Sequence, residues 1–253
     1  MNAPDDPLIR HVPELRQPAR RAAALGIALA CFAAASAALL LVDTRWPQWT
    51  LAGQAGVIGL GFLLAGQFFW RRREYRARYG ERAYRQAFLR FMLPGLPLMF
   101  AAIFHTLYLP GERLWSGPAA LAAVLLGVYL ALTGGLLYVR AYQYFGTDNL
   151  SMLYVYFPAE GRMVSSAIYA VLRHPAYSGA VRLGLAFGLW RGTPFSLLFG
   201  LFMPIGLTFW LRLAEEPELI ERFGAGYAEY RRRVPAFWPR PRDLRAFSRG
   251  AAP

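Results

Sequence analysis

The sequence predicts an all-α integral membrane protein with about six transmembrane helices. Hydrophobic residues make up 56% of the 253 residues and charged residues only 17%, whereas typical globular chains have roughly 45–50% and about 25%. The apolar residues are concentrated in runs of about 20 residues, the length a helix needs to cross the hydrocarbon core of a bilayer. All 28 basic residues are arginines, and most of them lie between these runs.

Four runs without acidic or basic side chains, apart from one histidine, predict the first four spans. The run at 91–109 contains that histidine, His105, and has two prolines near its start. The first run is too long for the core of a signal peptide and no small-residue cleavage site follows it, so we expect a retained helix. The four predicted spans are Ala22–Val42, Trp49–Trp70, Phe91–Leu109 and Pro118–Val139.

Two shorter runs predict a C-terminal helical hairpin. Pro175–Trp190 and Phe195–Leu211 are separated by Arg191-Gly192-Thr193-Pro194, and Gly-Thr-Pro is typical of a tight turn. The first of these runs contains Arg182. Because a charge is unfavourable in lipid, we expect Arg182 to face a cavity.

The distribution of arginine predicts the topology. With six spans, the outer loops hold three arginines and two acids, which leaves 25 arginines and 13 acids on the side of both termini. Basic residues in short loops stay in the cytoplasm, so we expect both termini there. Residues 71–90, with eight arginines and two glutamates, are expected to face anionic lipid headgroups. A nucleic-acid surface is disfavoured, because this segment lies between two spans.

The sequence excludes several other kinds of protein and site. A single cysteine, Cys31, rules out a disulfide framework and a cysteine-based metal site, and we predict no metal. No dinucleotide-binding glycine motif and no Ser-His-Asp arrangement occurs. We expect one structural domain, in which residues 1–110 form N-terminal membrane helices with a basic cytosolic loop and residues 111–253 hold the functional site.

The segment Arg173–Gly179 has a specific local structure. Pro175 keeps His174 out of the helical region of backbone space and is itself suited to the first position of a new helix. The first N–H groups of that helix are free to bind an anionic group such as a carboxylate. Taken alone, His174 is more simply an interfacial histidine with a backbone partner.

A pair of acidic residues, Glu215-Glu216, follows the last apolar run. In a tight hairpin, the start of one helix and the end of the other lie about 8–10 Å apart. We therefore expect Glu215 and Glu216 to face His174 and Tyr177. Two carboxylates beside an arginine suit a ligand that carries hydroxyl groups and positive charge.

A simpler explanation for acids here is helix capping. Pro217 is suited to start another helix, and acidic residues are favourable in its first turn. Capping accounts for Glu218 and Glu221 better than for the Glu215-Glu216 pair. The helix that follows is expected to be amphipathic and to lie on the cytosolic surface, with one apolar face formed by Leu219, Ile220, Phe223, Tyr227 and Tyr230.

These motifs together resemble the isoprenylcysteine carboxyl methyltransferases, which belong with the integral-membrane phospholipid methyltransferases. The resemblance covers about 80 residues in the C-terminal part of the chain. It rests on Gly161–Tyr169, Arg173–Gly179, Glu215-Glu216 and the ending Phe223-Gly224-x-x-Tyr227-x-x-Tyr230-x-x-x-Val234-Pro235.

The resemblance implies an enzyme that uses S-adenosyl-L-methionine bound on the cytosolic side. Arg212 is implied to bind the substrate, although it lies one residue out of step with the arginine that the family places there. Ala167 replaces a glycine usual in the family. No catalytic residue is assigned. The residues implied to line the cofactor site are Gly161, Arg162, Met163, Val164, Tyr169, His174, Pro175, Ala176, Tyr177, Glu215 and Glu216.

The implied activity is methyl transfer to a lipid-like or membrane-partitioned acceptor, with a carboxylate, amine or thiol as the accepting group. A phospholipid N-methyltransferase is an alternative within the superfamily. The arginine- and alanine-rich composition indicates a bacterial genome, so we expect a multi-pass protein of the bacterial inner membrane. The acceptor and the oligomeric state stay open.

Two other classes of protein fit the sequence less well. An NADPH-dependent sterol-type reductase shares the His-Pro-x-Tyr-x-Gly step and a Val-Pro ending. Such enzymes usually carry a cysteine shortly before that ending, where this chain has Arg231–Arg233. A non-catalytic transporter is disfavoured because no pair of inverted repeats is recognisable.

Overall fold

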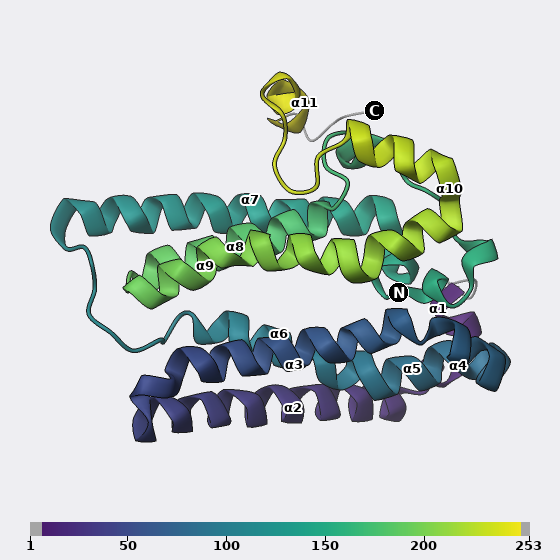
Figure 1. The fold of residues 1–253 in the computed structure, drawn as a ribbon, viewed down its shortest axis with the longest axis horizontal. Coiled ribbons are helices and arrows are strands. Elements are labelled where there is room, and N and C mark those ends of the chain that lie inside the picture. The colour runs from purple at the N-terminus through teal and green to yellow at the C-terminus, as the bar shows by residue number, and fades with distance from the viewer. Residues whose placement is uncertain (1–6, 249–253) are drawn as a thin grey trace. The chain divides into compact units, whose positions relative to one another are not determined.

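The computed structural model describes residues 7–248, and every regular element in that range is helical (Figure 1). The chain divides into two compact units. The first comprises the residues up to Pro110 together with Ser151–Ala159, and the second comprises Gly111–Leu150 and the residues from Glu160 onward. The all-α architecture predicted from composition is confirmed.

The first unit is built on three long helices. Two helices of apolar sequence are joined by a short turn at Pro47–Trp49, and the third follows a π-helical turn at Phe88–Met92. The arginine-rich segment 71–90 is helical for most of its length. The α-helices are Pro7–His11 (α1), Pro18–Arg45 (α2), Thr50–Trp70 (α3), Arg72–Tyr79 (α4), Ala83–Ala87 (α5) and Leu93–His105 (α6).

A hydrogen bond between His105 and Asp43 connects two of these helices. The Nε2 atom of His105 lies 2.8 Å from Oδ2 of Asp43, and the hydroxyl of Thr50 donates to Oδ1 of the same carboxylate at 2.8 Å. The His105 side chain is completely buried. Since an ionisable side chain is unfavourable among membrane helices without a partner, Asp43 accounts for the presence of His105 in an otherwise uncharged helix.

The second unit contains the hairpin and the helices around it. Its long first helix is kinked at Gly146, whose φ of +79° favours glycine. The fourth helix of the unit is likewise kinked at Gly224, with φ +59°. The α-helices are Gly117–Leu150 (α7), Pro175–Arg191 (α8), Pro194–Trp210 (α9), Glu216–Arg233 (α10) and Leu244–Ser248 (α11).

Five helical segments in the described range are long and apolar enough to cross a membrane. The predicted fifth span forms α8 but is not one of them. Its 17 residues give a length of about 26 Å, which is less than the hydrocarbon thickness of about 30 Å. The five segments are Pro18–Arg45, Pro47–Trp70, Arg72–His105, Gly117–Gly146 and Pro194–Arg233.

The predicted hairpin of α8 and α9 is present. Thr193 caps α9 in a capping box with Ser196, whose backbone N–H donates to the Thr193 hydroxyl at 3.2 Å. The helices approach closely at Gly188, where a methyl group would lie 2.8 Å from the carbonyl oxygen of Ser196. On the other side of α8, a methyl group on Gly179 would lie 2.7 Å from the carbonyl oxygen of Gly134 in α7.

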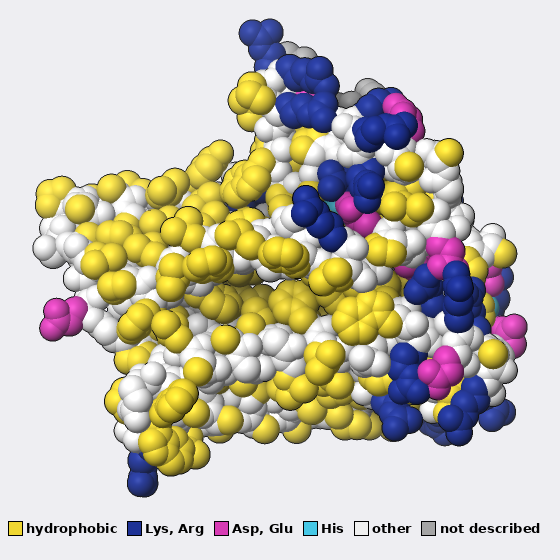
Figure 2. Space-filling view, viewed as in Figure 1, with side chains coloured by type: hydrophobic (Ala, Val, Ile, Leu, Met, Phe, Trp, Pro, Cys, Tyr) yellow, Lys and Arg dark blue, Asp and Glu magenta, His cyan; other side chains and the backbone are white. Residues whose placement is uncertain are grey.

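The surface of each unit matches a membrane environment. Large apolar side chains are exposed along the long helices, among them Leu29 at 58%, Leu132 at 69% and Leu201 at 61%. Figure 2 shows hydrophobic atoms along these helices. In the first unit arginines gather around α4, and in the second unit around α10 and α11 (Figure 2). Because water does not favour such apolar faces, the helices are suited to contact with lipid.

Candidate active site

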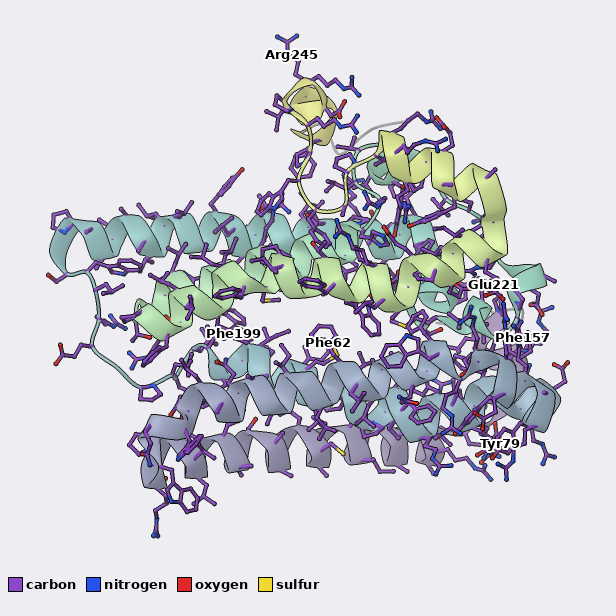
Figure 3. All side chains as sticks on the ribbon, viewed as in Figure 1. Phe62, Tyr79, Phe157, Phe199, Glu221 and Arg245 are labelled. Carbon is purple, nitrogen blue, oxygen red and sulfur yellow. The ribbon has the colours of Figure 1, made fainter. Side chains whose placement is uncertain are left out.

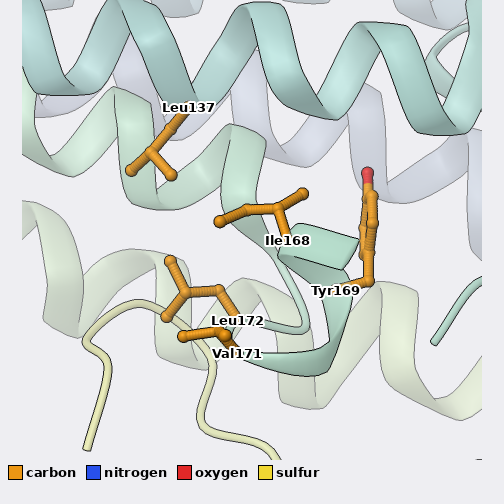
Figure 4. Packing of buried hydrophobic residues seen from close by; sticks show 5 residues of the cluster. All are labelled: Leu137, Ile168, Tyr169, Val171 and Leu172. Carbon is orange, nitrogen blue, oxygen red and sulfur yellow. The ribbon is translucent and has the colours of Figure 1, made fainter. Parts of the chain in front are cut away.

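The segment before α8 is held against α7 by a small hydrophobic cluster. It consists of Leu137 from α7 and four residues of the segment, namely Ile168, Tyr169, Val171 and Leu172 (Figure 4). The apolar run Met163–Leu172 contains only one short helical element, the 3-10 turn Ala167–Ala170. The cluster therefore fixes an irregular segment that leads directly to His174.

Tyr169 is fixed within this segment by its backbone. Its carbonyl oxygen accepts a hydrogen bond from the hydroxyl of Tyr230 in α10 at 2.7 Å. Burial raises the pKa of the Tyr169 hydroxyl, and the nearby Tyr230 and Glu215 act in the same direction. Tyr169 therefore stays neutral and offers a ring face and a hydroxyl rather than a charge.

His174 lies between the two glutamates of the predicted pair. Its Nδ1 is 3.6 Å from Oε1 of Glu215, and its Nε2 is 3.5 Å from Oε1 of Glu216. The hydroxyl of Tyr227 is 3.4 Å from the same Nε2. The backbone of His174 is non-helical, with φ −131° and ψ 66°, as Pro175 requires. The expected approach of the glutamates to His174 is confirmed.

The two glutamates have different electrostatic surroundings. Glu216 is buried and is paired with Nε of Arg173 at 2.8 Å and with a terminal nitrogen of Arg231 at 3.4 Å. Glu215 accepts a hydrogen bond at Oε2 from the Tyr177 hydroxyl at 2.7 Å, and 20% of its side chain is exposed. Arginine thus pairs with Glu216, whereas Glu215 is partly exposed and has no arginine partner among the described contacts.

A π-helical turn, Leu211–Glu215, brings Glu215 to this position at the end of α9. Such turns take up one extra residue and often occur at functional sites. Helix α10 begins immediately after it, with Pro217 in its first turn, so α9 and α10 are continuous through the turn. Arg212 lies in the turn with an exposed side chain, and the structure gives it no bond to the described residues.

The predicted site residues fall into two groups. His174, Tyr177, Glu215 and Glu216 lie together around the start of α8 and the end of α9, linked by the contacts above, and Tyr169 lies near Glu215. Pro175 and Ala176 form the first turn of α8 between them. Of the remaining four, Val164 packs against the cluster of Figure 4. No contact links Gly161, Arg162 or Met163 to the glutamates, and Arg162 and Met163 are exposed.

The expectation for Arg182 is wrong. Instead of facing a cavity, it is 95% buried against protein, with its guanidinium 4.7 Å from the ring centroid of Trp238. It donates to the backbone carbonyl of Ser178 at 3.2 Å and lies close to the hydroxyl of the same residue. The segment after α10, which contains Trp238, packs against Arg182 where the sequence analysis expected a cavity.

The amphipathic helix has the predicted apolar face. Tyr227 and Tyr230 are buried with Val234, and Leu219, Ile220 and Phe223 pack against them. Glu218, which capping accounted for, is buried and pairs with Arg222 at 3.1 Å. The acids of α10 therefore have separate roles, because Glu216 belongs to the His174 network and Glu218 to the helix itself.

The sequence did not predict that four further residues take part in this network. Arg173 and Arg231 neutralise Glu216, and Tyr227 approaches His174. Trp210 donates its indole N–H to the Tyr177 hydroxyl at 3.2 Å. The contact of Arg173 with Glu216 could have been predicted, because Arg173 is the residue before His174 in the motif. Arg231 lies 15 residues beyond Glu216, and no local pattern indicates that contact.

One comparison with known protein families found a match to part of the chain. Residues 122–226 match the family model described as phospholipid methyltransferase. The match begins within α7, earlier than the resemblance noted in the sequence, and includes the His174 and Glu215-Glu216 motifs. No curated protein and no solved structure matches the chain. Residues 122–226 are therefore similar to the phospholipid methyltransferase family, which lies in the same integral-membrane methyltransferase superfamily as the isoprenylcysteine carboxyl methyltransferases.

Proposed function

We propose that the protein transfers a methyl group from S-adenosyl-L-methionine to a lipid-like, membrane-partitioned acceptor. The observation that carries the proposal is the accessible carboxylate of Glu215 beside the buried His174 and the first turn of α8. We further propose that this site and both termini face the cytoplasm of a bacterial cell, as the arginine distribution favours.

The residues present suit the chemistry of this cofactor. Bound in the site, S-adenosylmethionine supplies an electrophilic methyl group on a sulfonium that carries positive charge. Glu215 offers a carboxylate for hydroxyl or ammonium groups, since it alone of the two glutamates lacks an arginine partner among the described contacts. The first turn of α8 offers N–H groups to a carboxylate. Tyr169 and Tyr177 offer ring faces, which attract cations.

The chain's own groups would act by positioning. Tyr177 and His174 orient Glu215, and Arg173 and Arg231 hold Glu216 so that it supports His174 from the other side. Holding two reactants in line accounts for a large part of the catalysis of a displacement reaction. A carboxylate or thiolate acceptor is already deprotonated, so its methylation needs no general base.

A phospholipid amine is a second candidate acceptor, favoured by the description of the matched family. An ammonium group must lose its proton before its nitrogen can attack. The candidate bases are Glu215 and His174, whose side chains lie 3.6 Å apart. An isoprenylcysteine-like carboxylate would make no use of them as bases, so the two acceptors differ in the expected pH dependence of the rate.

The test uses the purified full-length protein in detergent or nanodiscs. We expect saturable binding of S-adenosylmethionine and transfer of its labelled methyl group into one fraction of a total lipid and protein extract. Separation of the lipid, protein and small-thiol fractions then identifies the acceptor class. Binding of NADPH without binding of S-adenosylmethionine would overturn the proposal in favour of a reductase.

A further inference from the structure

The residues that follow α10, 234–248, form a C-terminal strap across the start of α8. Four consecutive carbonyl oxygens of the strap accept hydrogen bonds from residues 173–178. The guanidinium of Arg173 donates to Val234 at 2.7 Å, and the backbone N–H groups of Arg173 and His174 donate to Pro235 at 3.0 Å and Ala236 at 3.3 Å. The hydroxyl of Ser178 donates to Phe237 at 2.5 Å.

Arg182 fastens the strap one turn further along α8. Its NH1 lies 3.5 Å from the Phe237 carbonyl, and its guanidinium packs over the Trp238 ring. None of the described carboxylates pairs with Arg182, so carbonyl oxygens and aromatic rings compensate its buried charge. A buried arginine held in this way has a strong preference for one geometry, because its planar fork must match fixed acceptors.

The far end of the strap returns to the segment that carries Tyr169. Phe247 in α11 packs against the cluster of Leu137, Ile168, Tyr169, Val171 and Leu172. The guanidinium of Arg182 is also 5.5 Å from the Phe247 ring. Arg245 of the same short helix points away from the body of the second unit (Figure 3). The inner face of the strap therefore contacts both segments that lead to His174.

Arg173 links the strap to the glutamates. Its side chain donates to the Val234 carbonyl and, through Nε, to Oε1 of Glu216 at 2.8 Å. His174, whose N–H bonds to the strap, is the residue that lies between Glu215 and Glu216. A displacement of the strap would thus release two residues of the site at once.

We propose that Arg182 and Trp238 form a latch that holds the strap and thereby positions Arg173 and His174 for binding of the cofactor. Arg182 is a positioning residue, since it contacts neither of the glutamates. The effect on the cofactor rests on the proposed function, whereas the attachment of the strap does not.

The test compares Arg182→Gln with Arg191→Gln, a matched change at the C-terminal end of the same helix. Trypsin cleavage after Arg233, Arg242 and Arg245 reports release of the strap without any cofactor, and neither substitution changes these cleavage sites. We expect faster cleavage for Arg182→Gln alone. We also expect about tenfold weaker binding of S-adenosylmethionine, measured by titration calorimetry below the unfolding temperature, because a desolvated cation–π contact and hydrogen bonds are lost.

Trp238 supplies a second variant in case Arg182→Gln does not fold. Trp238 is 46% exposed, so its replacement leaves no internal cavity. Trp238→Leu is expected to reproduce both effects, and Trp238→Phe to restore cofactor affinity, because an aromatic face is retained. Faster cleavage with unchanged cofactor affinity, or no change in cleavage, would overturn the latch. If the wild-type protein does not bind the cofactor, the proposed function fails, while the cleavage rates still decide whether Arg182 holds the strap.

Discussion

The hydroxyl of Tyr177 donates a hydrogen bond of 2.7 Å to the carboxylate of Glu215, and this bond joins the start of α8 to the end of α9. The indole of Trp210 donates to the same hydroxyl at 3.2 Å, which fixes the direction of its proton toward Glu215. One carboxylate oxygen is thereby oriented, and the other lies toward His174. The geometry of the hairpin determines where the negative charge of the site is placed.

Replacing Glu215 with glutamine tests whether that charge binds the cofactor. Glu215→Gln keeps the shape of the side chain but removes its charge, and a hydrogen bond to a charged group contributes about 1.5–3 kcal/mol. We expect S-adenosylmethionine to bind about 10- to 100-fold more weakly in a calorimetric titration. Glu221→Gln is the matched control, because Glu221 is an exposed residue of α10 that carries no part of the proposed site (Figure 3). Equal affinities for the two variants would remove Glu215 from the site.

Tyr177→Phe separates orientation from charge. It removes the hydroxyl that holds Glu215 but keeps the ring and the carboxylate. We expect a smaller loss of affinity than in Glu215→Gln, about five- to tenfold, as for a single lost hydrogen bond. A loss as large as that of Glu215→Gln would instead indicate that the Tyr177 hydroxyl contacts the cofactor directly.

Close contact between α7 and α8 predicts that Gly179 tolerates no side chain. A methyl group there would lie 2.7 Å from the Gly134 carbonyl oxygen, which belongs to backbone and has little freedom to move. We expect Gly179→Ala to destabilise the protein by about 1–3 kcal/mol, measured as a lower unfolding temperature in detergent. Gly135→Ala is the control, because no atom lies within 4 Å of its added methyl group. A Gly179→Ala protein as stable as the control would show that the helices can separate freely.

The features that could be predicted from the sequence depend on interactions between residues close together in the chain. The apolar runs give the long helices, Pro175 gives the start of α8, and Arg191-Gly192-Thr193-Pro194 gives the turn between α8 and α9. The pairing of Glu215 with Tyr177 followed from the hairpin, since its two ends must be adjacent. These contacts depend on residues that are near in the chain or related by one tight turn.

The contacts that could not be predicted connect segments distant in the chain. The strap bonds to Arg173 and His174 through backbone carbonyls, which leave no residue pattern. The burial of Arg182 against Trp238 depends on where the strap returns, 56 positions later in the sequence.

The backbone at Ala167 yields a final prediction. Its φ is +51°, in the left-handed region, which costs an L-residue about 1–2 kcal/mol and costs glycine almost nothing. This is the position where the resembling family usually has glycine, so the conformation is the one that the family's residue favours. We expect Ala167→Gly to raise the stability of the folded protein by about 0.5–1 kcal/mol, because relief of this strain exceeds the added entropy of the unfolded chain. Thermal unfolding of Ala167→Gly beside Ala170→Gly, a change at an exposed residue with negative φ in the same turn, measures the difference. Equal destabilisation by both substitutions would mean that residue 167 does not hold the left-handed conformation in solution.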